Sequence, residues 1–118
     1  MSRTRWQRKA PDFYWKQGDT APAIAEQFFD GTGTAVNLTG ATVKFMMWGQ
    51  GDTAVKVNAT ATITDATLGK VSYTPNSTDT NTKGIYLVEW QVTFGGGAIE
   101  TFPNSDWQKV LIKADIAA

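Results

Sequence analysis

The sequence contains no cysteine and no histidine, and these two absences remove several classes of function. Without cysteine there is no disulfide framework, no thiolate nucleophile and no zinc-finger site. Without histidine, the usual general base near neutral pH and the commonest transition-metal ligand are both missing. We therefore expect a protein that is not an enzyme and that holds no metal or cofactor.

Long apolar runs are also absent, since no stretch approaches the roughly 18 residues that a membrane span requires. The N-terminal arginines are not followed by an apolar segment, so we expect no secretory signal. The chain has 118 residues, of which 42% are hydrophobic. This length and composition are typical of one globular domain with a single core.

Charge is balanced overall but unevenly distributed. Residues 1–9 contain three arginines and one lysine without an acid, a local charge of +4, whereas the rest holds seven lysines against eleven acids, a net charge of −4. We expect residues 1–11 to form a flexible basic arm before a domain at 12–118. Such an arm is either a frayed terminus or a segment that docks on an acidic partner. Nucleic acid is not the expected partner, because four charges are few and the remaining chain is acidic.

Short segments of alternating polarity, separated by turn residues, run through the whole chain. This pattern predicts an all-β fold, an immunoglobulin-like antiparallel β-sandwich of about eight short strands. The 17 threonines suit the solvated faces of such sheets. The expected strands span residues 12–17, 20–29, 41–48, 55–64, 70–74, 85–94, 98–102 and 107–113.

Most acidic residues fall in predicted turns, where aspartate bonds to its own backbone. Residues 30–33 and 49–52 are superficially similar to calcium or phosphate loops, but they lack the EF-hand spacing and a following Lys-Ser/Thr pair. We expect both to be turns. Glu26 is the exception, because the alternation that turns Ile24 inward also turns Glu26 inward. We expect it at the rim of the sandwich, where Lys16 or Lys44 could pair with it.

Six motifs follow one another in order within residues 12–113: Phe13–Pro22, Asn37–Phe45, Asp65–Tyr73, Gly84–Tyr86, Glu89–Phe94 and Glu100–Asn104. In their order and spacing they resemble one family of tailed-phage structural proteins, the N-terminal domain of the baseplate upper protein. The resemblance implies an immunoglobulin-like module of the virion that anchors or adapts other structural proteins, and it implies no enzymatic activity.

We therefore expect a virion structural protein that docks on a larger head, neck, tail or baseplate assembly. Its partners would be other virion proteins or further copies of itself, and no membrane. The expected contact residues are the basic arm and apolar residues at outward positions of two strands: Arg3, Arg5, Trp6, Arg8, Lys9, Met46, Trp48, Ile85 and Leu87.

Two alternatives remain open at this point. The first is a capsid decoration or cement protein, which differs in location and copy number. The second is a carbohydrate-binding module for host adhesion, for which two or three exposed coplanar aromatics are needed. The candidates for that platform are Trp15, Trp48 and Trp107.

Overall fold

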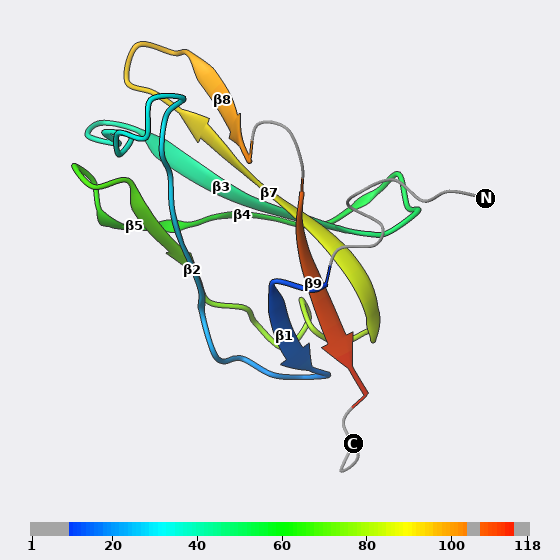
Figure 1. Cartoon of the computed structure of the whole chain (residues 1–118). Helices are drawn as coiled ribbons and strands as arrows, with labels where there is room; N and C mark the ends of the chain where they lie inside the picture. Colours follow the sequence, from blue (N-terminus) through cyan, green and yellow to red (C-terminus); the bar gives the residue numbers. More distant parts are fainter. Residues whose placement is uncertain (1–9, 104–106, 115–118) are drawn as a thin grey trace.

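The computed structural model describes residues 10–103 and 107–114, which form two packed β-sheets (Figure 1). No helix occurs among these described residues. The nine strands are β1 (Phe13–Lys16), β2 (Ile24–Gln27), β3 (Thr42–Gly49), β4 (Val55–Thr60), β5 (Thr62–Asp65), β6 (Lys70–Tyr73), β7 (Gly84–Thr93), β8 (Ile99–Phe102) and β9 (Gln108–Lys113). The all-β sandwich expected from the alternating pattern is confirmed.

The large sheet has the order β1-β9-β7-β3-β4, and β8 also pairs with β7 beyond the end of β9. The small sheet has the order β2-β6-β5. The long strands β3 and β7 lie side by side through the middle of the molecule (Figure 1). One pair departs from the antiparallel prediction, because β1 runs parallel to β9, with Phe13 opposite Val110.

A second correction concerns residues 55–64, which were predicted as one strand. The chain changes sheets at Ala61: β4 pairs with β3 in the large sheet, whereas β5 pairs with β6 in the small sheet. Ala61 is buried at the change and donates its backbone N–H to the Val43 carbonyl, 2.8 Å away. The predicted segment 20–29 is also shorter than expected, since only Ile24–Gln27 forms a strand.

The core lies between the two sheets and is rich in aromatic rings. Phe45 of β3 stacks on Tyr73 of β6, with ring centroids 4.2 Å apart, and meets the edge of Trp90 at 5.0 Å. Phe28 stacks on Phe102 at 4.6 Å. The stack of Phe45 on Tyr73 joins the two sheets, and all three ring contacts add to the free energy gained by burying the rings.

A polar bridge between the sheets accounts for Glu26. The Gln108 side chain accepts a hydrogen bond from the Trp90 indole at 2.6 Å and donates one to the Glu26 carboxylate. Glu26 is half-buried, and its expected partner was wrong: it is bonded to an amide, not to Lys16 or Lys44. An amide satisfies the carboxylate without bringing a second charge out of water.

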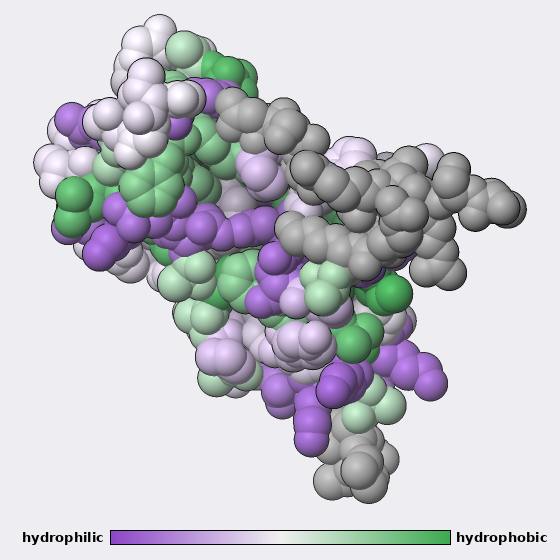
Figure 2. Space-filling view, viewed as in Figure 1, coloured by the Kyte–Doolittle hydropathy of each residue, from purple (hydrophilic) through white to green (hydrophobic). Residues whose placement is uncertain are grey.

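The outer surface is mixed in polarity. Over the described residues that face the viewer in Figure 2, hydrophobic and hydrophilic side chains are interspersed. Mixed colouring of this kind is usual for a surface in contact with water. A grouped set of apolar side chains outside the core is therefore informative.

Candidate interaction surface

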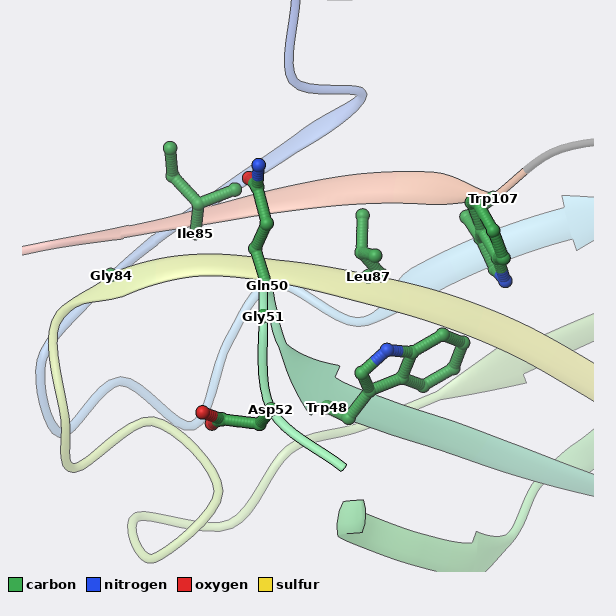
Figure 3. Close-up of a pocket in the computed structure, with 8 residues that line it drawn as sticks. All are labelled: Trp48, Gln50, Gly51, Asp52, Gly84, Ile85, Leu87 and Trp107. Carbon is green, nitrogen blue, oxygen red and sulfur yellow. The ribbon is translucent and has the colours of Figure 1, made fainter. Parts of the chain in front are cut away.

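An open groove lies on the outer face of the large sheet, where β3 ends and β7 begins (Figure 3). Its volume is about 860 Å³, which lies within the usual range for ligand sites. The described residues that line it are Trp48, Gln50, Gly51, Asp52, Gly84, Ile85, Leu87 and Trp107. We refer to it below as the tryptophan groove.

Strand register brings the apolar members of the groove together. Trp48 of β3 lies directly opposite Leu87 of β7. Both point away from the core, because their chain neighbours Met47 and Val88 are fully buried between the sheets and successive side chains alternate in direction. Figure 3 shows Leu87 beside the two indoles, with Ile85 farther along the same strand. The groove is thus a product of the pairing between β3 and β7.

The two tryptophans form one wall. Their ring centroids are 6.2 Å apart and their planes are inclined by 88°, an edge-to-face contact. Trp107 also donates a hydrogen bond to the Glu89 carboxylate. Burial raises the pKa of Glu89, and this bond opposes the shift. Trp107 is therefore fixed on two sides, by a ring and by a carboxylate.

A tight turn forms the polar end of the groove. Gly51 adopts φ of +90°, and the Asp52 N–H donates to the Gly49 carbonyl at 2.9 Å. The Asp52 carboxylate lies against Gly49, since a Cβ there would be 2.3 Å from its Oδ2 atom. Burial is the main reason why the pKa of Tyr86, beneath the turn, is raised, and the charge of Asp52 adds to this effect. A larger residue at position 49 would displace this carboxylate.

Gln50 adds an amide to the same end of the groove. Its backbone N–H donates to the Ile85 carbonyl at 2.9 Å, which ties the turn to β7. Its side-chain oxygen is buried and has no hydrogen-bond partner among the described residues. The groove therefore combines apolar walls with an amide oxygen and a carboxylate at one end.

The structure gathers three of the four predicted outward residues of the domain in this groove. Trp48 is half-buried, and Ile85 is 41% exposed. Leu87 faces outward as predicted, but its expected exposure was wrong: it is only 4% exposed, because it lies between Trp48 and Lys109 in the neighbouring strands. Met46 does not line the groove; it is half-buried opposite Glu89.

The other predicted contact residues lie outside the described part of the chain. They are Arg3, Arg5, Trp6, Arg8 and Lys9.

Three residues of the groove, Gln50, Asp52 and Trp107, were not predicted as contact residues. Trp107 was considered only as a sugar-stacking ring, because its place relative to the alternation of the last strand was ambiguous. Gln50 and Asp52 were assigned only to a turn. Their position after an outward-facing tryptophan was the available signal.

The coplanar aromatic platform expected for a carbohydrate-binding module is not present. Trp15 is 2% exposed and belongs to the core, where its indole N–H donates to the Pro22 carbonyl at 2.8 Å. Trp48 and Trp107 are perpendicular and not coplanar. A sugar could therefore stack on one ring only.

The acidic loop at residues 30–33 is a turn, as predicted. The Asp30 carboxylate accepts hydrogen bonds from Thr32 N–H at 2.8 Å, Thr32 Oγ1 at 2.6 Å and Thr34 N–H at 3.0 Å. The bonds from Thr32 are the main reason why the pKa of Asp30 is lowered. Within the described residues no group of three or more acidic side chains could hold a metal ion.

None of the described segments forms a helix long and apolar enough to cross a membrane. No model of a known protein family matches the chain, and no curated protein matches it significantly.

Proposed function

We propose that this protein is a structural module of a bacteriophage particle, an immunoglobulin-like sandwich that attaches to a larger assembly through the tryptophan groove. It acts by contact and carries out no catalytic step. The observation that carries the proposal is the gathering of Trp48, Ile85, Leu87 and Trp107 in one open groove on the outer face of the large sheet. The resemblance of residues 12–113 to a baseplate family supports an assembly of a phage particle, whether at the head, neck, tail or baseplate.

The groove can supply a useful but modest binding free energy. Covering the apolar walls of the groove contributes about 2 kcal/mol, at about 25 cal/mol for each Å² of apolar surface removed from water. A contact of this strength is weak for one molecule. It becomes effective in a particle, where many copies engage a symmetric lattice at once.

Particle composition tests the proposal. Quantitative mass spectrometry of purified particles from the source of the gene should detect the chain at a fixed ratio to the major structural proteins. A few copies per particle indicate a baseplate, neck or tail position, whereas hundreds indicate decoration of the capsid. Absence of the chain from intact particles would overturn the proposal.

A matched pair of variants tests whether the groove is the contact. Ile85→Ala removes an exposed side chain inside the groove, and Ile99→Ala removes one on β8, where Ile99 is 63% exposed and lies outside the groove. Ile85→Ala should lower the number of copies per particle, and Ile99→Ala should leave it unchanged. Equal occupancy for both variants would place the contact elsewhere.

Binding of a host glycan is the second candidate function. The specific observation in its favour is the combination of a tryptophan wall with the Gln50 amide and the Asp52 carboxylate in one open groove. Host polysaccharide should then change the intrinsic tryptophan fluorescence of the protein, and Trp48→Phe should reduce that change. No response at millimolar sugar would remove this candidate.

A further inference from the structure

We propose that residues 1–9 of the same chain dock on the tryptophan groove and cover it until a partner displaces them. Docking of residues 1–9 would regulate access to the groove. Their displacement by a partner rests on the proposed docking function. Three observations support it: the place where the segment joins the domain, its length, and its charge.

The segment joins the domain beside the groove. Asp12 is held to the start of β9 by two hydrogen bonds of 2.8 Å, from its N–H to the Lys109 carbonyl and from the Lys109 N–H to its carboxylate. Lys109 in turn lies opposite Leu87, which lines the groove. Residue 12 is therefore anchored one strand away from the groove.

The direction of the chain also favours this arrangement. β1 runs parallel to β9, with Phe13 opposite Val110. Residues before Phe13 therefore lead back toward the beginning of β9, which is the side where Trp107 stands.

The length of the segment is sufficient. Nine extended residues span about 30 Å, at about 3.3–3.6 Å per residue. Trp48 lies on β3, which is separated from β9 only by β7 in the order of the large sheet. This corresponds to about 10 Å across the strands, at about 4.8 Å for each step. Residues 1–9 can therefore reach both tryptophans.

The charges are complementary. The segment carries +4 from three arginines and Lys9, together with the aromatic side chain of Trp6. The described lining of the groove contains the Asp52 carboxylate and no lysine or arginine. The Glu89 carboxylate lies next to this lining, bonded to Trp107. Lys109 lies on the same face but is only 6% exposed. The groove thus offers carboxylates and apolar walls to a segment of arginines and a tryptophan.

Attachment to the same chain makes weak docking sufficient. A short tether gives the segment an effective concentration in the millimolar range. The cover would shield an apolar groove that could otherwise cause non-specific association. A partner with a larger complementary surface would displace it, and the released basic segment would then be free to contact the same partner.

The absence of cysteine allows a direct test on the full chain. A nitroxide spin label on Ser2→Cys is then at a unique site, and its paramagnetic broadening is read on the Trp48 and Trp107 indole signals and the Ile85 methyl signals. We expect strong broadening of all three at low protein concentration. The matched control is a label on Gly96→Cys, in the turn after β7, where an added Cβ meets no atom within 4 Å. It should leave the groove signals sharp.

Two further measurements define the outcomes. In the first, isotope-labelled protein that carries no nitroxide is mixed with Ser2→Cys protein that carries the nitroxide but no isotope label. This mixture should show no broadening, because the contact is within one chain. Reversing the charge with Arg3→Glu, Arg5→Glu and Arg8→Glu in the spin-labelled chain should remove most of the broadening, and Ile99→Ala should not affect it.

Three results would overturn the inference. They are sharp groove signals in the spin-labelled chain, broadening that occurs only in the mixed sample, and broadening that charge reversal leaves unchanged. The second result would assign the groove to the segment of another copy. Because these readings are made on the isolated protein, they are independent of whether the chain is found in particles.

Discussion

The Tyr73 hydroxyl donates a 2.5 Å hydrogen bond to the Asp79 carboxylate, and both residues are buried. The same carboxylate accepts the Asn76 N–H at 3.1 Å, and the Asn76 side chain accepts the Asp79 N–H at 2.9 Å. Burial is the main reason why the pKa of Tyr73 is raised. The hydrogen bond to Asp79 and the charge of Asp79 raise it further. Through this pair, the loop after β6 is fastened to the core ring that stacks on Phe45.

Tyr73→Phe should therefore destabilise the protein while keeping the ring stack. Hydrogen bonds to charged groups contribute about 1.5–3 kcal/mol, and we expect a loss of this size in the free energy of unfolding from urea denaturation. Tyr14→Phe is the control, since Tyr14 is exposed on the outer face of β1. Equal stability of the two variants would show that the buried bond contributes nothing.

Gly69 is required by a close approach of backbone atoms. Its φ is +66°, and an added Cβ would lie 2.7 Å from the Val36 carbonyl oxygen and 2.9 Å from that of Phe28. Backbone oxygens cannot move aside as the end of a side chain can, so Gly69→Ala should cost about 2 kcal/mol or more. Gly96→Ala is the matched control, because an added Cβ at position 96 meets no atom within 4 Å. We expect this variant to change the midpoint of thermal unfolding only slightly.

The Gln108 bridge should be more costly to lose than an ordinary surface amide. Gln108→Ala removes the partner of the buried Trp90 indole and leaves the half-buried Glu26 without its amide donor. We expect the free energy of unfolding to fall by about 2–4 kcal/mol, which is the summed cost of leaving two polar groups in the protein interior without a hydrogen-bond partner. Gln91→Ala, on the outer face of β7, should change stability by less than about 0.5 kcal/mol. A loss at position 108 no larger than this would mean that water replaces the amide without cost.

The strands were predictable wherever one face is buried and the other is solvated. Tyr86, Val88, Trp90 and Val92 alternate along β7 and all face the core. The change of sheets at Ala61 was not predictable, because the inward residues on either side of it, Val57, Ala59 and Ile63, are all odd-numbered, so the alternation continues through the change. The parallel pairing of β1 with β9 joins distant segments, and no local pattern encodes it.

The groove was predictable only in part, for a related reason. Alternation identified Trp48, Ile85 and Leu87 as outward, but it carries no information on what lies across the strand. Leu87 is covered because its neighbours in the sheet are large, Trp48 on one side and the stem of Lys109 on the other. Exposure on a sheet face depends on register, and register is a tertiary property.

The raised pKa of Glu89 gives a prediction for the dependence of stability on pH. Burial raises this pKa above its ordinary value of 4.5, so above pH 4.5 the folded state binds a proton more readily than the unfolded state. Stability contributed by this group is therefore full at low pH and is lost as pH rises from about 4.5 through the raised pKa. Glu89→Gln removes the titration and keeps an acceptor for the Trp107 indole. The wild-type protein should lose stability relative to Glu89→Gln as pH rises through this window.

This difference between the two proteins is the quantity to measure, because other carboxylates act in the opposite direction. The pKa of Asp30 is lowered by the bonds of its turn, so its contribution is lost as pH falls, and it is the same in both proteins. Urea unfolding at a series of pH values from 4 to 8 gives the difference directly. A constant difference across this range would mean that Glu89 titrates alike in both states, and that its burial beside Trp107 carries no electrostatic cost.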